Sequence, residues 1–422
     1  MNASPADVAI LGAGAAGMFT ALATHARGLR VVVVEPAPET PNNFAISGGL
    51  FPAAGSRLQR EAGVQDAPED WLEDLRAYAA GEVNERIAPF VAHALPEVVE
   101  FLLGQGAPVR FLPDVVGPAH RALRFHSVTP ASGAAFHAWF RQALRDRGIP
   151  MVGSASAPRT VLATGGFAGN PAMVAQHIPS MEGALHNGSA TNDGSGIALG
   201  LARGGQLWGM SGYQGQAHTH PGGATRLGMS IPAMGGVMVN REGRRFVRED
   251  LGPSALAPHV LRQPGGVALE VFDAGIEGQL GNHSAYRDAV AAGRVLTGQS
   301  VRQLATQAGV DAAALEQTIA TVNRCASGEA TDPLGRERFA RVLQAPFKAS
   351  WVTGALSHTQ GGLVTDADGR VLDAQDRPIE GLFACGGCAA GLAGRDAEGY
   401  LPGNGLAQAF GLGWRVAQAL TR

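Results

Sequence analysis

The sequence predicts an α/β protein that begins with a parallel βαβ unit and continues into a second domain. The apolar run 8–11 is followed by a glycine-rich turn, a helix-forming segment 18–26 and a second apolar run 29–34. Two apolar runs joined by a helix are typical of neighbouring parallel strands. The length of 422 residues is enough to bury a large core and to form two domains.

The glycine-rich turn carries the motif Gly12-x-Gly14-x-x-Gly17. Gly12 allows the tight turn, Gly14 lets a pyrophosphate approach the backbone, and Gly17 lets the helix pack close to the sheet. The helix N-terminus offers N–H groups and a positive dipole end to the phosphates. Glu35 ends the second apolar run, where it is placed to accept hydrogen bonds from ribose hydroxyls. Together these features predict a dinucleotide site, with glycine-rich packing as the alternative.

The composition excludes several classes of protein. A net charge of −3 gives no basic surface for nucleic acid or an anionic membrane, and no run of 18 apolar residues predicts a membrane span. Lys348 is the only lysine, so a Walker-type phosphate lysine is excluded. Because removal of a leader peptide would destroy the glycine motif, the sequence predicts a cytoplasmic protein.

The three cysteines predict neither a disulfide framework nor a metal site. Cys325, Cys385 and Cys388 are too few for a scaffold of disulfides, which fits a reducing compartment. Cys385-x-x-Cys388 has no second pair and no nearby His/Cys cluster that would complete a metal site. We therefore expect no metal, and we expect any electrons to travel on one organic cofactor.

The remaining pattern predicts further helices and strands. Helical periodicity covers 67–103, 134–147, 197–203, 310–325 and 405–420. A β-type run closed by glycines covers 159–167, a buried strand covers 379–384, and hairpins are predicted at 236–246 and 361–373.

Seven motifs follow one another along the chain, at 12–17, 47–49, 163–166, 192–194, 236–246, 359–363 and 402–406. In this order they resemble the fumarate reductase / succinate dehydrogenase flavoprotein superfamily, which also contains 3-ketosteroid dehydrogenases and tricarballylate dehydrogenase. The resemblance covers almost the whole chain and implies a Rossmann-like FAD-binding domain with an inserted α+β capping domain. We expect FAD-binding segments over 1–215 and 346–422, and the capping domain over 216–345.

The resemblance also implies which residues line the FAD. The glycines of the first motif and Glu35 hold the ADP half, and 47–49 run beside the isoalloxazine and the phosphates. The last helix directs its N-terminus at the flavin N1/O2 edge, where negative charge develops on reduction. The predicted set is Gly12, Gly14, Ala15, Ala16, Gly17, Glu35, Pro36, Asn43, Ser47, Gly48, Gly49, Thr164, Gly165, Asn192, Asp193, Gly387, Asn404, Gly405 and Leu406.

Three departures from the family pattern concern the cofactor. Asn42 stands where members with covalent FAD have a histidine, so we predict noncovalent FAD. Gly387 replaces the acid usually found at a strand end, so one ribitol hydrogen bond is lost or supplied elsewhere. Most members carry a β-meander before the 163–166 motif, whereas here Gly148 leads almost directly to Thr160. This deletion would shorten the adenine side of the domain and weaken FAD binding.

The resemblance implies candidate catalytic residues, each with a structural alternative. His220 matches a histidine that holds a substrate carboxylate, with His218 as a less favoured stand-in; the alternative for His220 is local backbone bonding in a glycine-rich loop. Arg336 matches the arginine that donates the proton in fumarate reduction, and its alternative is a salt-bridged structural arginine. Arg124 and His126 match a substrate-side segment, with a solvated loop as their alternative.

Other positions argue against fumarate as the substrate. The segment 232–235 replaces the family's proton relay, and Ser357 and Tyr400 replace a histidine and an arginine that bind carboxylates. A buried dicarboxylate without these partners would be costly. The phenol of Tyr400 is instead suited to a ketone oxygen, an enolate or an α-proton, with core packing as its alternative. Tyr213 and Arg395 are lesser candidates.

The sequence therefore predicts an FAD oxidoreductase that acts on CH–CH bonds. Hydride would pass between flavin N5 and a carbon β to a carbonyl or carboxylate of a small-molecule substrate, with an electron donor or acceptor that the motifs do not name. One alternative is a dicarboxylate reductase of the fumarate reductase type that uses Arg336 and His220. Another is a flavin-binding protein without catalysis.

Overall fold

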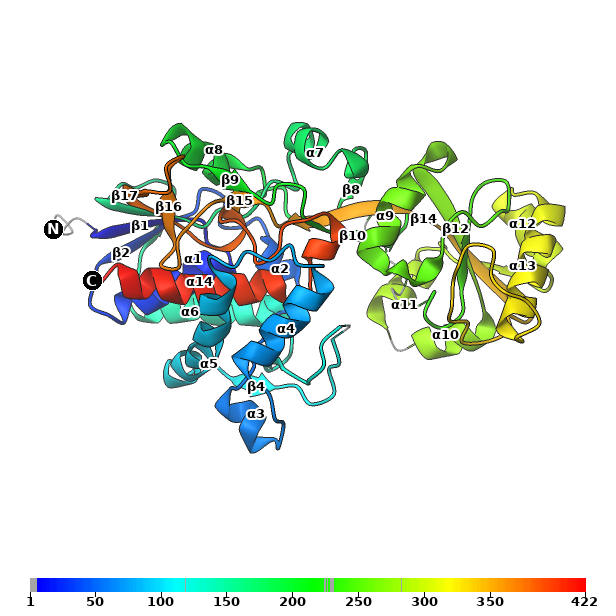
Figure 1. The fold of residues 1–422 in the computed structure, drawn as a ribbon, viewed down its shortest axis with the longest axis horizontal. Coiled ribbons are helices and arrows are strands. Elements are labelled where there is room, and N and C mark those ends of the chain that lie inside the picture. Colours follow the sequence, from blue (N-terminus) through cyan, green and yellow to red (C-terminus); the bar gives the residue numbers. More distant parts are fainter. Residues whose placement is uncertain (1–5, 118, 224, 226, 228–230, 282) are drawn as a thin grey trace. The chain divides into compact units, whose positions relative to one another are not determined.

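The computed structural model describes residues 6–117, 119–223, 225, 227, 231–281 and 283–422 (Figure 1). The chain forms two compact units. Unit 1 contains residues 1–178, 188–214 and 358–422, and unit 2 contains residues 179–187 and 215–357. The predicted capping segment 216–345 lies inside unit 2, which extends further to include 179–187 and 346–357.

Unit 1 is built on a six-stranded sheet in the order β16-β17-β7-β1-β2-β6. The first two apolar runs form β1 (Val8–Leu11) and β2 (Val31–Val34), which pair in parallel, Val8 opposite Val31. β7 (Arg159–Leu162) and β17 (Pro378–Ala384) extend the parallel sheet on one side and β6 (Met151–Val152) on the other. β16 (Arg370–Leu372) is the antiparallel edge strand.

The helices of unit 1 bury an aromatic core against this sheet. α1 (Ala15–His25) packs against α14 (Asn404–Ala419) and α6 (Gly133–Asp146), and the three lie alongside one another below the sheet in Figure 1. Phe136 and Phe140 of α6 stack with ring centroids 5.1 Å apart, and both contact Phe410 of α14. The other helices are α2 (Asn43–Ile46), α3 (Arg57–Glu61), α4 (Pro68–Tyr78), α5 (Ala88–Gly104), α7 (Pro171–His177) and α8 (Ser195–Ala202).

Two smaller sheets complete unit 1. One has the order β3-β5-β4 and the other pairs β15 with β9. Their strands are β3 (Phe51–Pro52), β4 (Val109–Phe111), β5 (Phe125–Val128), β9 (Leu207–Trp208) and β15 (Gly362–Leu363). Among the described residues of the whole chain, no helix is long and apolar enough to cross a membrane.

Unit 2 has an α+β architecture around a mainly antiparallel sheet. Its strand order is β10-β14-β12-β11, and β8 and β13 also pair with β14. The strands are β8 (Leu185–His186), β10 (Tyr213–Thr219), β11 (Val237–Val239), β12 (Val267–Asp273), β13 (Leu296–Gly298) and β14 (Phe347–Thr359). The helices are α9 (Pro253–Leu261), α10 (Ala274–Leu280), α11 (Ser284–Ala291), α12 (Val301–Ala308) and α13 (Ala312–Ala326).

One predicted element differs from the structure. The helical pattern over 67–103 is interrupted between α4 and α5, where Ala80 and Gly81 have φ angles of 47° and 85° that a helix cannot hold. The hairpin predicted at 361–373 is present in short form: Thr365 bridges Val371, and the Leu372 amide donates to the Val364 carbonyl at 2.9 Å. The outer strands β15 and β16 also pair with β9 and β17.

Candidate functional site

The three motif glycines occupy different environments at the start of α1. A Cβ on Gly12, which has φ +103°, would overlap the carbonyl oxygen of Ala163, and one on Gly17 would overlap that of Gly12. A Cβ on Gly14 would meet no described atom within 4 Å. Gly12 and Gly17 are therefore required by packing, whereas Gly14 borders open space. No described side chain caps α1, so its first N–H groups are available to an anion.

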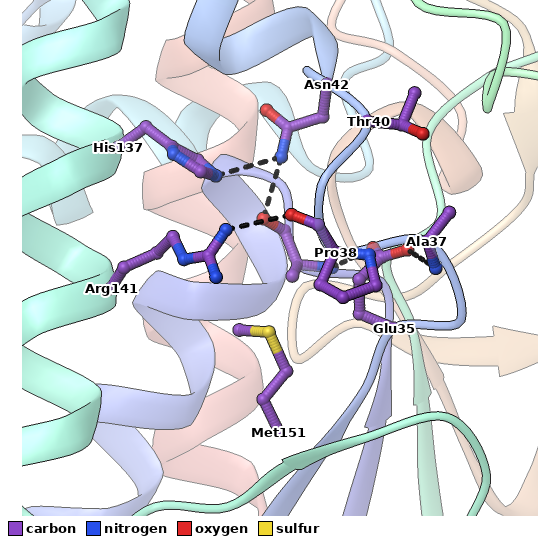
Figure 2. Close-up of a pocket in the computed structure, with 9 residues that line it drawn as sticks. Glu35, Ala37, Pro38, Thr40, Asn42, His137, Arg141 and Met151 are labelled. Carbon is purple, nitrogen blue, oxygen red and sulfur yellow. Dashed lines mark hydrogen bonds between the residues drawn. The ribbon is translucent and has the colours of Figure 1, made fainter.

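Glu35 is held beside this turn (Figure 2). Its Oε2 accepts from the Ala13 amide at 3.0 Å and its Oε1 from the Ala37 amide at 3.0 Å. A carboxylate has about four lone-pair sites, so capacity for ribose hydroxyls remains. Asn42 donates to the Ala13 carbonyl at 2.9 Å and lies 3.2 Å from His137 Nε2. These residues and Arg141 line a small cavity next to the α1 turn.

Two further loops border the same region of unit 1. Asn43 Oδ1 accepts from the Ser189 amide at 2.6 Å, and Ser47 Oγ accepts from the Gly49 amide at 3.1 Å. Gly49 has φ +68°, a conformation that favours glycine. Asn43, at the start of α2, is thus held to the segment before α8, and the turn 47–49, which includes Gly48, is closed by its own serine.

The residues after β7 form a second tight contact. Gly165 has φ +87°, and a Cβ there would overlap Asn192 Oδ1. Asp193 Oδ1 accepts from the Ser195 amide at 2.9 Å, which fixes the start of α8. Thr164 Oγ1 lies 3.1 Å from Cys388 Sγ. These predicted cofactor residues therefore form one packed set of backbone turns.

Gly387 lies against the same turn. A Cβ on Gly387 would lie 2.7 Å from the Gly166 amide nitrogen. Because that neighbour is backbone and has no flexible side chain to move away, no acid fits at this position without a shift. The glycine at position 387 thus permits the close approach of these two backbone segments.

The N-terminus of α14 holds a buried amide without partners. Asn404 is 1% exposed, and neither its Oδ1 nor its Nδ2 has a hydrogen-bond partner among the described residues. Leaving a buried polar group unsatisfied costs about 1–3 kcal/mol. No described side chain caps the helix, which begins after Gly403. The first turn, which also contains Gly405 and Leu406, therefore leaves an amide and backbone N–H groups without a partner among the described residues.

Tyr400 lies four residues before that turn. Its ring meets the ring of His358 edge to face, with centroids 4.9 Å apart. Burial raises the pKa of Tyr400 to about 12, so the phenol is protonated at neutral pH. Burial also lowers the pKa of His358, which favours its neutral form. Sequence reasoning missed His358, although its neighbour Ser357 marked the segment.

Arg124 and His126 lie in the interior, not in a solvated loop. Arg124 is 0% exposed and donates to Asp66 at 3.0 Å through two nitrogens and to Asp74 at 2.7 Å. His126 Nε2 lies 2.8 Å from Ser56 Oγ, and burial lowers its pKa to about 4. Their polar atoms are bound within unit 1, which favours a structural role for both. Sequence reasoning missed the two aspartates.

Arg336 is similarly engaged within unit 2. It is 4% exposed, and its guanidinium donates to Glu249 at 3.1 Å and to the carbonyls of Gly236, Pro232 and Arg338 at 2.6–2.9 Å. These four bonds occupy most of its five donors. The structure therefore favours the salt-bridged alternative for Arg336.

The two histidines of the glycine-rich loop in unit 2 differ. His220 Nδ1 accepts from the Gly222 amide at 3.0 Å, and burial with nearby Arg294 lowers its pKa. This is the local backbone bonding expected of the structural alternative. His218 Nδ1 lies 3.0 Å from Glu270 Oε1, and both residues are buried.

The cysteines are buried and poorly reactive. Cys385 Sγ lies 3.6 Å from Thr20 Oγ1, and burial raises the pKa of Cys385 to about 12 and also raises that of Cys388. Low-pKa, accessible thiols are the reactive ones. The part of the chain that the structure describes holds no cluster of His, Cys, Asp and Glu suited to a metal ion.

A protein-family model, the FAD binding domain, matches residues 7–152 and 151–406. Among curated proteins, the chain is 28% identical to a probable fumarate reductase, Ifc3, of Shewanella frigidimarina, over 97% of this chain and 74% of that protein. It is 26% identical to an NADH:fumarate oxidoreductase of Klebsiella pneumoniae over 95% of this chain, but it spans only 46% of that longer protein.

Solved structures are similar over nearly the whole chain. An open conformation of a flavocytochrome c3 fumarate reductase superposes with a TM-score of 0.86 and 25% identity, covering 99% of this chain and 78% of that one. A 3-ketosteroid Δ1-dehydrogenase from Sterolibacterium denitrificans superposes with a TM-score of 0.82 and 22% identity, covering 99% and 100%.

Proposed function

Because the chain belongs to the FAD binding domain family, we propose that it binds FAD in unit 1, at the turn before α1, beside Glu35 and at the first turn of α14, and acts as an oxidoreductase on carbon–carbon bonds. The residues present fit this cofactor. Gly14 leaves open space before the uncapped α1, Glu35 is held at the ribose end, and the Asn404 amide is buried without a partner. When bound, FAD supplies two-electron hydride chemistry.

We propose a substrate with a neutral carbonyl group, and a hydride that is exchanged at the carbon β to it. The protonated phenol of Tyr400 supports this assignment, because a neutral donor polarises a ketone oxygen and stabilises an enolate without a counter-ion. In both directions the phenol would stay protonated and hold the enolate oxygen, while the proton at the α carbon is exchanged with solvent.

The second candidate is reduction of a dicarboxylate. It is favoured by the relatives named as fumarate reductases, at 26–28% identity. Against it, Arg336 is bound to Glu249 and three carbonyls, and His220 is bound to its own loop. Binding two carboxylates would require cations that these contacts occupy.

A steady-state assay separates the two. The purified yellow protein is supplied with reduced viologen and either fumarate or a cyclic enone, and with an artificial acceptor and a saturated cyclic ketone. We expect turnover of the enone or ketone to exceed that of fumarate. Faster turnover of fumarate would contradict the proposal of a neutral carbonyl substrate.

The third candidate, a catalytically silent flavoprotein, is tested with the same preparation. Dithionite and sulfite titrations followed by absorbance report a flavin that accepts electrons and a reactive N5. A bleached flavin that no candidate substrate reoxidises would favour the silent protein.

Acid precipitation that leaves all flavin in the supernatant would support noncovalent FAD, as Asn42 predicts.

The cellular setting stays a prediction. A cytoplasmic location is checked by fractionation, and recovery of the protein outside the cytoplasm would contradict it. The electron partner is sought by testing whether NADH alone, or only a reduced carrier protein, supports turnover.

A further inference from the structure

A second cavity lies beyond Glu35 in unit 1 and has a volume of about 680 Å³. Its apolar lining comes from Pro36 after β2 and from Leu144 and Ile149 at the end of α6. Arg141 and Arg145 stand on the same side of α6, and Met151, Val152 and Gly153 form the edge of the sheet. A volume of this size is in the range of small-molecule sites.

The cavity is open because little chain follows β6. Residues 153–158, all described, contain no helix or strand and lead directly to β7. Gly153 and the three residues after it are exposed, as are Arg145 and Gly148 on the rim. The two stretches that match the family model meet at residues 151–152, at the same edge.

Glu35 stands between two cavities, which fixes the order of the ligand's groups. Glu35 lines both this cavity and the small cavity next to the α1 turn. A dinucleotide whose phosphates lie at α1 and whose ribose reaches Glu35 has its base as the next group. Pro36, Leu144 and Ile149 give that base an apolar floor suited to a flat heteroaromatic ring.

FAD bound in unit 1, as proposed above, has its adenine at this cavity. We propose that the cavity leaves this adenine uncovered, so that the folded protein exchanges FAD and accepts bulk on adenine N6. The inference rests on the proposed binding of FAD to unit 1. Ligand sites usually bury 70–90% or more of a ligand's surface, and an adenine that solvent reaches contributes less to retention than a covered one.

The test uses the full chain stripped of flavin by dialysis against bromide. FAD, FMN and FAD carrying an aminohexyl chain on adenine N6 are titrated, and flavin fluorescence is followed. We expect the N6-substituted FAD to bind within about threefold of FAD, and bound FAD to exchange with added N6-substituted FAD within minutes. Binding of the substituted FAD that is more than tenfold weaker than FAD overturns the proposal, as does FAD that does not exchange over hours.

Two variants test which part of the site binds which part of FAD. Ile149→Ala shortens the apolar floor, so the Kd for FAD is expected to rise severalfold while the Kd for FMN, which has no adenine, stays unchanged. An equal loss for both ligands overturns the adenine assignment. Gly14→Val closes the space before α1 and is expected to abolish binding of all three. If the wild-type chain binds none of them, the FAD assignment itself fails; if it binds FAD but not the substituted form, only the open cavity fails.

Discussion

At the scale of single residues, the buried charge cluster of unit 1 contains one arginine between two aspartates. Arg124 holds Asp66 and Asp74 in a region with no solvent exposure at the guanidinium. Removing one partner of a buried ion pair leaves an uncompensated charge. We expect Arg124→Ala to lower the free energy of unfolding by about 3–5 kcal/mol, measured in urea.

The matched control for Arg124 is Arg76→Ala. Arg76 pairs with Glu85 at 2.8 Å on the exposed surface. An exposed pair contributes about 0–1 kcal/mol, so this change should leave stability almost unaltered. An Arg124→Ala protein that keeps its stability but loses turnover would show that Arg124 acts on substrate.

Tyr400 offers a test by activity. We expect Tyr400→Phe to lower kcat about 10²–10³-fold, the usual effect of removing one donor to a developing oxyanion, with FAD affinity unchanged. The raised pKa of about 12 means that the phenol stays protonated as pH rises from 7 to 10. We therefore expect no decrease in kcat between pH 7 and pH 10 from deprotonation of Tyr400. A kcat unchanged by the substitution would assign Tyr400 to packing against His358.

At the scale of elements, the turn into α1 separates packing glycines from a ligand-facing one. Gly17→Ala places a methyl group on the carbonyl of Gly12, whereas Gly14→Ala places one in open space. We expect Gly14→Ala to keep the thermal stability of the apo protein and to weaken FAD binding at least tenfold. Gly17→Ala is expected to destabilise the apo protein itself. Calorimetry and flavin fluorescence measure the two effects, and equal stability losses would contradict this division.

A substitution in the first turn of α14 is expected to raise the stability of the apo protein and to lower its affinity for FAD. Asn404→Leu replaces a buried, unsatisfied amide by an apolar group of similar shape. We expect the apo protein to gain about 1–3 kcal/mol, because an unsatisfied buried group is removed. The same change should weaken FAD binding, because the amide partners are lost. Unchanged FAD affinity would show that this amide does not face the cofactor.

Sequence patterns predicted correctly the helices and strands that depend on local sequence. The βαβ unit followed from glycine spacing and apolar runs, and α14 was placed within one residue at each end, at Asn404–Ala419. The interruption between α4 and α5 was missed, since periodicity alone does not reveal a turn with positive φ. Likewise, β15 pairs with β9 through a contact distant in sequence.

The candidate site was predictable where backbone geometry requires a residue type, as at Gly12 and Gly17. It was less predictable where tertiary partners decide a role. The motif around Arg336 predicts a catalytic role, yet its guanidinium is bound by Glu249, which is distant in sequence. The role of Arg124 likewise depends on its ion pairs with Asp66 and Asp74, and no local sequence pattern predicts that these aspartates lie next to it. The orphaned amide of Asn404 is visible only once its surroundings are folded.

At the scale of the whole molecule, each unit is assembled from separated stretches of chain. Unit 1 is complete only when residues 358–422 supply β16, β17 and α14 to the sheet and helices formed by the first 178 residues. Such long-range pairing slows folding because distant segments must meet before their contacts form. The C-terminal stretch is therefore required for the sheet and the core of unit 1, and for the FAD site proposed there.

The three buried cysteines can report local unfolding of each unit, because a buried thiol reacts only after its surroundings unfold. Cys385 and Cys388 belong to unit 1 and Cys325 to unit 2, and all three are buried. A small alkylating reagent added during gentle heating would mark each thiol when its surroundings loosen. We expect saturating FAD to delay marking of Cys385 and Cys388 more than that of Cys325, as mass spectrometry of the digested chain would show. An equal delay of alkylation at all three cysteines would mean that unit 1 and unit 2 unfold together. Otherwise, the order in which the cysteines are alkylated shows which unit unfolds first.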